Sequence, residues 1–127
     1  MSHTYTWELT GLYRKFTGNV DGEEILISNF EVQAHPNFGQ IKYIINDFTE
    51  MTGSSISTDH SRIYARTDDI ISNSKGQLKI AIIATLDEHI TLAINYREEM
   101  KNNRFECEIF GTVEDAREWI GRPAIPF

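Results

Sequence analysis

The sequence lacks the features that mark secreted, membrane-spanning and disulfide-bonded proteins. It has one cysteine, Cys107, so no disulfide can form within the chain, and a lone cysteine fits a reducing compartment. No apolar run approaches the roughly twenty residues that a membrane-spanning helix needs. The first residues show no basic segment followed by an apolar run, so a signal peptide is not expected. We therefore expect a cytoplasmic protein that is not an integral membrane protein.

Basic charge is also scarce. The chain has 12 Lys and Arg against 19 Asp and Glu, which gives a formal net charge of -7. Arg14 and Lys15 are the only adjacent basic pair, and no stripe of positive charge is present that could follow a phosphate backbone. An acidic protein is repelled by polyanions at long range, so neither nucleic acid nor an anionic membrane surface is an expected partner.

Catalytic and metal-binding motifs are missing as well. The histidines form no HxH or HExxH pattern, so we expect surface or capping positions for His3, His35, His60 and His89. A GxSxG nucleophile motif is absent. The two glutamates beside Cys107 would raise the pKa of its thiol, which indicates a buried structural cysteine rather than a nucleophile. We expect no metal, no cofactor and no enzymatic activity.

What is present is the pattern of a globular α/β domain. The 127 residues, 40% of them hydrophobic, suit one domain over residues 1–127. Alternation over residues 5–9, followed by Gly11 and a second strand over 12–17, predicts an antiparallel hairpin. Asp21 and Glu24 form a capping-box pattern, and the helix that they open ends at His35, before a proline.

The rest of the chain alternates strands with helices. A central strand is predicted over 41–48 and a polar loop over 49–57, with a helix starting near Ser57 or Thr58. Residues 78–84 are nearly all apolar, which is typical of a parallel strand covered on both faces. Thr85 is predicted to cap the next helix, residues 105–109 form a strand with one wet face, and Thr112 caps the last helix. The predicted order is β-β-α-β-α-β-α-β-α with a mixed, largely parallel sheet.

This order resembles the STAS fold of bacterial anti-sigma-factor antagonists. The resemblance rests on residues 18–24 and on the segments IKYIINDF, KIAIIAT and VEDAREWI. More narrowly, the chain is similar to the SpoIIAA-like (STAS/SEC14-type) group of small single-domain proteins. A closing segment with F, DA and W is common there, and it corresponds to Phe110, Asp115, Ala116 and Trp119. The similarity covers most of the chain after the first strand and implies fold more strongly than activity.

The resemblance also implies a place for phosphorylation. The antagonists are phosphorylated on a serine just past a central strand, at the start of the following helix, in a D-S-S-G-L type motif. Residues 52–56 correspond to this motif, and Ser54 and Ser55 match its two serines. Gly53 replaces the acid and Ile56 replaces the glycine. Ser54 and Ser55 are therefore candidate phosphoacceptors in a motif that departs from the family pattern.

Further candidates for binding a ligand or a partner lie at the predicted carboxyl ends of the strands, where open α/β sheets bind ligands. These residues are Asp47, Ser57, Thr58, Thr85 and Asp87. The alternative is that they are caps and turn formers, and that the two aspartates are solvated and do not form a pair.

Two functions follow as hypotheses. The first is a non-enzymatic regulatory domain that binds a protein partner through residues 54–58 and the following helix. The second is a carrier or sensor of a small apolar ligand, of SEC14-like kind, held in an aromatic-lined pocket beneath the helices. Phe38 and the apolar residues 125–127 are predicted to form an apolar contact surface, either a lid or the interface of a homodimer.

Overall fold

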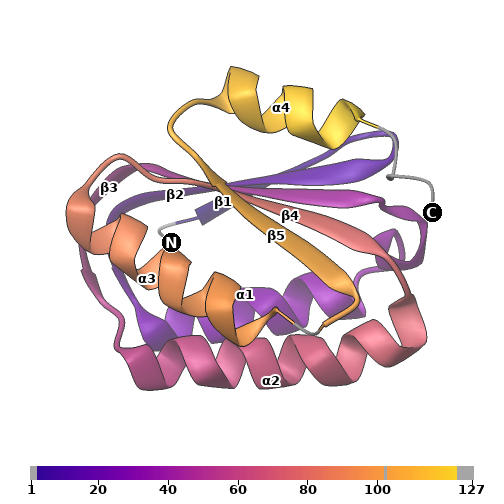
Figure 1. The fold of residues 1–127 in the computed structure, drawn as a ribbon, viewed down its shortest axis with the longest axis horizontal. Helices are drawn as coiled ribbons and strands as arrows, with labels where there is room; N and C mark the ends of the chain where they lie inside the picture. The colour runs from indigo at the N-terminus through magenta and orange to yellow at the C-terminus, as the bar shows by residue number, and fades with distance from the viewer. Residues whose placement is uncertain (1–2, 102, 123–127) are drawn as a thin grey trace.

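A computed structural model describes residues 3–101 and 103–122 of the chain, and Figure 1 shows its fold. The strands lie in the order β1-β2-β3-β4-β5, with β1 antiparallel to β2 and the other neighbours parallel. The predicted element order and the mixed, largely parallel α/β class are confirmed. The elements are β1 (His3–Trp7), β2 (Gly11–Asp21), α1 (Gly22–Ala34), the 3-10 helix η1 (Phe38–Gln40), β3 (Tyr43–Ser55), α2 (Thr58–Lys75), β4 (Leu78–Ile83), α3 (Asp87–Glu99), β5 (Phe105–Phe110) and α4 (Val113–Gly121).

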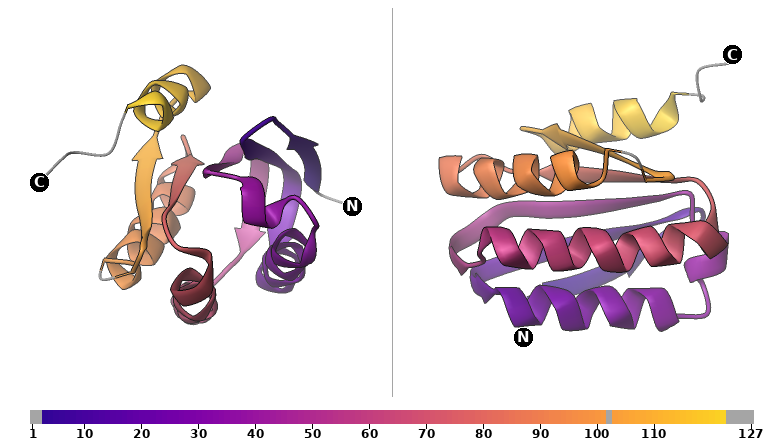
Figure 2. Two further views of the ribbon diagram at one scale, coloured as in Figure 1. Left: turned by 90° about the vertical axis from the view of Figure 1, so that its right-hand side faces the viewer. Right: turned by 60° about the horizontal axis from the view of Figure 1, so that its bottom comes forward.

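The helices form two unequal layers. Helices α1, α2 and α3 cover one face of the sheet and α4 covers the other (Figure 1; Figure 2). Each parallel strand is added on the same side of the previous one, and crossovers share one hand, so the three crossover helices fall on the same face. Helix α4 follows the last strand and is free to cover the opposite face. No described helix is long and apolar enough to cross a membrane.

Each layer encloses its own core. The larger core lies between the sheet and α1–α3, where Leu12 and Phe16 of β2 are fully buried. The smaller core lies under α4 and contains Ile45, Ala81 and Ile83 of the sheet with Ala116 of the helix. Strand β4 is therefore buried on both faces, as its apolar run predicts.

Three of the predicted helix starts are confirmed by their caps. The side chain of Asp21 accepts a hydrogen bond from the backbone N–H of Glu24 at 2.8 Å, and Thr112 caps α4 in the same way. Ser57 caps α2. The predicted Thr85 cap is wrong, because α3 begins at Asp87 after an uncapped Leu86. The N–H of Ala84 still donates to the carbonyl of Phe110 at 3.1 Å, so the chain stays extended past β4 before it can turn into a helix.

The predicted loop over residues 49–57 is mostly strand. Strand β3 continues to Ser55 because the long strand β2 runs beside it and pairs as far as Asp21 with Ser55. Two irregularities in the register accommodate this polar extension, one of them next to Gly18, whose φ is 72°. Tertiary pairing thus overrides the local turn signal of a Ser/Thr-rich segment.

The structure does not show the apolar contact surface that was predicted for Phe38 and residues 125–127. Phe38 is buried at 9% exposure within η1, and Nζ of Lys75 lies over its ring, 5.2 Å from the centroid. Residues 125–127 lie outside the described part of the chain. The exposed large apolar side chains of the helical layer lie instead on the three helices; they are Ile27, Phe30, Ile63, Ile70 and Ile94.

Gly11 offers a direct test of this packing. A Cβ at Gly11 would stand 2.2 Å from ring atoms of Tyr43, whose hydroxyl is bonded to Glu8, so the ring cannot easily move. We expect Gly11→Ala to lower the free energy of unfolding by about 1–3 kcal/mol in urea denaturation. Gly39→Ala is the control: nothing lies within 4 Å of its Cβ position, and it should change stability by less than about 0.5 kcal/mol. Equal effects of the two substitutions would contradict the packing described.

Candidate functional site

The carboxyl end of the sheet gathers most of the residues that the sequence singles out. Ser54 and Ser55 end β3, and Ser57 and Thr58 begin α2. Thr85 and Asp87 connect β4 to α3 at the same end of the molecule, on the left of Figure 1. All of these side chains are exposed except that of Ser54, which is half-buried. The structure therefore brings them to one edge but shows no hydrogen bond between the two loops in the described residues.

Ser57 occupies the position at the start of α2. Its hydroxyl accepts from the backbone N–H of His60 at 3.3 Å, while Nδ1 of His60 accepts from the backbone N–H of Ser57 at 3.0 Å. This reciprocal capping box fixes the end of the helix. Ser54 and Ser55 remain within the strand, so Ser57 is the serine that lies just past a central strand and at the start of a helix.

Asp47 lies elsewhere. It is 3% exposed in the middle of β3, on the face toward α4, and accepts hydrogen bonds from Tyr13 and from the backbone and hydroxyl of Thr49. Burial and the nearby carboxylate raise the pKa of Tyr13. Asp87 begins a helix on the opposite face, so the two aspartates do not form a pair. No cluster of three potential metal ligands is found in residues 3–101 and 103–122.

A different site lies inside the larger core. A partly open cavity of ≈ 80 Å³ lies between the sheet and helices α1, α2 and α3. Its wall is largely apolar, with Ile44, Ile80 and Ile82 from the sheet. Polar side chains from five elements interrupt this wall; they are Arg14, Asn29, Gln33, Asn46, Ser61, Asp68 and His89.

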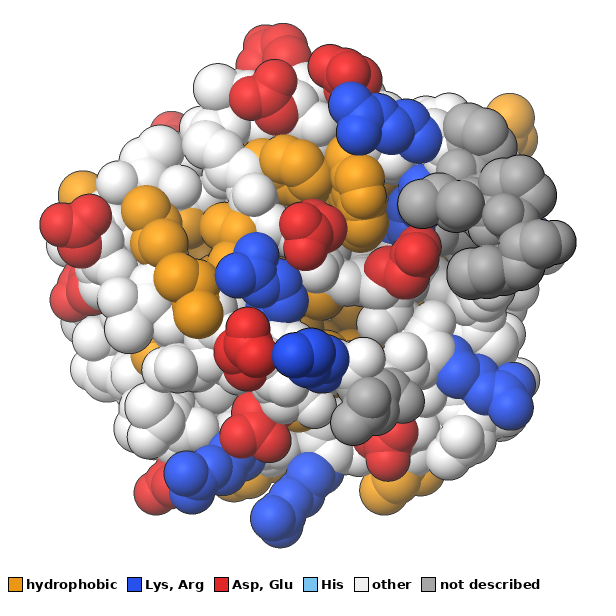
Figure 3. Space-filling view, viewed as in Figure 1, with side chains coloured by type: hydrophobic (Ala, Val, Ile, Leu, Met, Phe, Trp, Pro, Cys, Tyr) orange, Lys and Arg blue, Asp and Glu red, His pale blue; other side chains and the backbone are white. Residues whose placement is uncertain are grey.

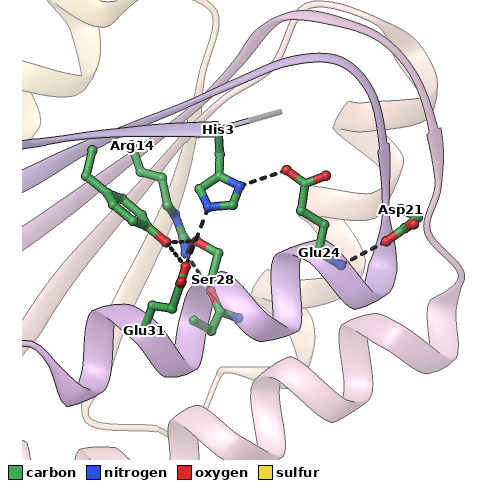
Figure 4. A network of polar contacts seen from close by, with 8 residues as sticks. His3, Arg14, Asp21, Glu24, Ser28 and Glu31 are labelled. Carbon is green, nitrogen blue, oxygen red and sulfur yellow. Dashed lines mark hydrogen bonds and ion pairs between the residues drawn. The ribbon is translucent and has the colours of Figure 1, made fainter. Parts of the chain in front are cut away.

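Arg14 is the only arginine or lysine among the buried residues described, at 5% exposure. Its Nε donates to Oδ1 of Asn46 at 2.9 Å. Its Nη1 donates to Oγ of Ser28 (Figure 4) and to Oδ1 of Asn29, both at 2.8 Å. The ring of Phe16 lies 5.1 Å from the guanidinium. Burial lowers the pKa of Arg14, since the charged form is desolvated and its bonded partners are all neutral.

The polar network around Arg14 continues to the first strand. The Tyr5 hydroxyl bonds to Ser28 at 2.8 Å and donates to Oε1 of Glu31 at 2.7 Å (Figure 4). Nδ1 of His3 contacts Oε2 of Glu24 at 2.7 Å. These contacts attach β1 to α1. His3 is 7% exposed, so the predicted surface position of this histidine is wrong.

Asp68 is on the opposite wall of the cavity. It projects from the inner face of α2 at 8% exposure and accepts hydrogen bonds from Tyr96 and, at 3.0 Å, from Nε2 of Gln33. Burial raises its pKa to about 6, although the hydrogen bonds and the charge of Arg14 oppose this shift. Burial and Asp68 together raise the pKa of Tyr96.

His89 is the third ionisable group of the cavity wall. At 1% exposure on α3 it also contradicts the predicted surface position. Neither ring nitrogen has a hydrogen-bond partner in the described residues. Nε2 does lie 3.3 Å from Oε1 of Glu88, but without hydrogen-bond geometry, so this is a charge contact at most. A buried polar group without a partner costs about 1–3 kcal/mol, so the ring nitrogens of His89 need a partner that the described side chains do not supply.

The nearby thiol of Cys107 is half-buried, and burial raises its pKa to about 12, so it stays protonated, as the sequence predicts. On the face shown in Figure 3, acidic and basic side chains are interspersed. The cavity wall carries the Arg14 cation and the titratable side chains of Asp68, His89, Tyr64 and Tyr96.

These cavity residues are absent from the sequence-based candidates for a binding site, although three of them carry a signal in the sequence. Arg14 stands between Leu12 and Phe16 in the alternation of a strand, which places a cation on the buried face. Asp68 follows Tyr64 by four residues on the inner face of a helix. His89 precedes the buried Ala93 by four residues on the inner face of α3. A charged or polar residue in phase with an apolar stripe is therefore the pattern that could have identified the site.

Comparison with known proteins identifies the fold alone. No protein-family model and no curated protein matches the sequence. Among solved structures, an uncharacterized DUF3478-family protein with a SpoIIAA-like fold from Shewanella loihica PV-4 is 16% identical, with a TM-score of 0.54 over 93% of this chain and 91% of that one. The anti-sigma factor antagonist SpoIIAA in its unphosphorylated form is 9% identical, with a TM-score of 0.57 over 93% and 96%. The chain therefore has a SpoIIAA-like, STAS-type fold.

The raised pKa of Asp68 predicts a pH dependence of stability. A folded pKa of about 6 lies above the usual aspartate value of 3.8, so between these two pH values the folded state holds a proton that the unfolded state has lost. The contribution of this group to the free energy of unfolding is fully present below about pH 4 and is lost as the pH rises through 6. We expect Asp68→Asn, which cannot ionise, to gain about 2–3 kcal/mol relative to the wild type between pH 4 and pH 7 in urea denaturation.

Asp69→Asn is the matched control, since Asp69 is exposed and adjacent. Its stability difference from the wild type should stay nearly constant over the same pH range. Parallel curves for the wild type and Asp68→Asn would show that Asp68 is already ionised in the folded protein at pH 4.

Proposed function

We propose that this protein is a non-enzymatic regulatory domain that binds a protein partner through the start and outer face of helix α2. The observation that carries the proposal is the combination of exposed hydroxyls and exposed apolar side chains on this one helix. Ser57 and Thr58 begin it, and Ile63 and Ile70 lie on its outer face at 44% and 71% exposure. The SpoIIAA-like fold supports this proposal, because one structure of this fold is an anti-sigma factor antagonist.

A phosphate at this place would change the partner surface without unfolding the helix. The N-terminus of a helix stabilises negative charge through its free N–H groups and its dipole. Asp59 already lies in the first turn of α2, so a phosphate adds like charge to an acidic surface and opposes an acidic partner. Ser57 has the position at the helix start, and Ser54 and Ser55 remain candidates at the end of β3.

The switch can be tested with two variants at one position. Ser57→Asp adds a negative charge and Ser57→Asn does not, and both side chains are good helix caps. With affinity-tagged protein in its own host, we expect partners that co-purify with the wild type to be retained by Ser57→Asn and reduced at least tenfold by Ser57→Asp. The double variant Ser54→Asp, Ser55→Asp tests whether negative charge at the end of β3 releases the partners as well as charge at the start of α2.

A second set of variants tests the apolar outer face of α2. Ile63→Ser together with Ile70→Ser should release the same partners, whereas Leu9→Ser should not, because Leu9 is 96% exposed in the hairpin turn away from α2. Equal partner recovery from all variants would disprove an α2 interface.

The partly open cavity supports a second function, the binding of a small molecule as a carrier or sensor. Its ≈ 80 Å³ is smaller than the roughly 150 Å³ that holds one benzene ring in an engineered protein core, so an acyl chain does not fit unless the helices separate. The apolar carrier therefore stays a hypothesis that requires an opened helical layer.

Intact mass distinguishes the two functions. For protein isolated from its own host, an increment present under native conditions and lost on denaturation indicates a carried small molecule. A phosphate-sized increment that survives denaturation and maps to residues 54–58 indicates the switch. Bare mass in both spectra would count against each of these and leave partner binding without phosphorylation.

A further inference from the structure

The cavity between the sheet and helices α1–α3 has hydrogen-bonding capacity that the protein does not use. A guanidinium has five N–H donors. Three of those of Arg14 are directed to Asn46, Ser28 and Asn29, and the two on Nη2 make no hydrogen bond in the described residues. Nδ1 of His89 is likewise without a partner there. Both side chains line the same cavity.

The cavity wall holds one buried cation, Arg14, and one carboxylate, Asp68, that is not hydrogen-bonded to it. Arg14 has no carboxylate among its hydrogen-bonding partners. The carboxylate of the cavity wall, Asp68, is bonded to Tyr96 and Gln33 instead. Glu31 bonds to Tyr5 outside the cavity. A buried guanidinium with neutral partners attracts an acceptor that carries negative charge, and its flat donor geometry matches a carboxylate.

The size of the cavity limits what that acceptor can be. A cavity of ≈ 80 Å³ has about half the volume of the one that binds the six heavy atoms of benzene. It therefore accommodates about three or four heavy atoms. The isoleucine side chains that make up much of the wall suit a methyl group beside the charged end.

We propose that this cavity is a binding site for a small carboxylate of about the size of acetate, held by Nη2 of Arg14 within a wall that also contains His89. The inference rests on the small-molecule function proposed above and names the class of ligand. It requires no reaction: the carboxylate is bound and released unchanged. A phosphate, with its tetrahedral shape and larger charge, suits the site less well than a planar anion does.

The first test uses the purified wild-type protein and acetate. In ¹H–¹⁵N spectra at constant ionic strength, we expect acetate to shift the Arg14 side-chain signal and the amides of cavity-lining residues, with a saturable dissociation constant of about 0.1–10 mM. Acetamide has the same shape without the charge, and chloride has the charge without the shape. Neither should produce the same shifts.

Variants then locate the site. Ala93→Leu fills the cavity without removing any of its polar groups, because Ala93 lines the wall at 2% exposure. Arg14→Gln removes the cation, and Arg66→Gln makes the same change at an exposed position of α2. Acetate should raise the urea midpoint of the wild type and of Arg66→Gln, but not that of Ala93→Leu or Arg14→Gln.

Each outcome decides the proposal. Saturable shifts confined to the cavity, lost in Ala93→Leu, support it, and if Arg14→Gln fails to fold, Ala93→Leu and the wild-type spectra decide alone. Equal effects of acetamide and acetate, shifts outside the cavity, or no saturation by 100 mM acetate overturn it. A carried molecule found by native mass in the absence of acetate binding would leave the carrier function standing and remove only the carboxylate assignment.

Discussion

The buried guanidinium of Arg14 constrains the whole helical face of the sheet. An isolated charge in an apolar core costs several kcal/mol, so the fold must supply oxygen acceptors near the guanidinium. Asn46 supplies one from the neighbouring strand, and Ser28 and Asn29 supply two from α1. The position of α1 over β2 and β3 is thereby fixed by hydrogen bonds as well as by apolar packing. Tyr5 bonds to Ser28 and carries the same constraint to β1.

The face under α4 shows how the same chain treats polar groups that serve structure only. Glu8 accepts two hydrogen bonds from the guanidinium of Arg117, at 3.0 and 2.7 Å, and a third from Tyr43. This pairing lowers the pKa of Glu8 and joins the hairpin turn to the last helix. Here the charges are matched and no cavity is associated with them. On the helical face the cation has neutral partners, and His89 keeps unused ring nitrogens beside a cavity. This difference distinguishes a binding site from a structural clamp.

The sequence predicts the order of elements well, because each depends on local patterns. Alternation in the hairpin, the apolar run of β4 and the caps at Asp21 and Thr112 all act within a few residues. The failures arise where a distant segment decides. Residues 49–55 become strand because β2 pairs with them, and Phe38 is buried because the chain folds over it. The cavity could be anticipated only in part: a charge in phase with an apolar stripe indicates burial at Arg14, but whether it faces a void depends on three helices at once.

Helix α2 connects the two proposed functions physically. Its inner face carries Asp68 to the cavity, and its outer face carries Ile63 and Ile70 to the surface. A ligand in the cavity can move α2 only if it binds with different affinity to two positions of this helix. Coupling between the cavity and the outer face therefore requires that the contacts in the cavity change when α2 moves. Asp68 meets this condition, because its hydrogen bonds to Tyr96 on α3 and Gln33 on α1 span three helices. An anion beside Arg14 weakens the attraction of that cation for an ionised Asp68, and the stability of the three-helix arrangement then depends on what the cavity holds.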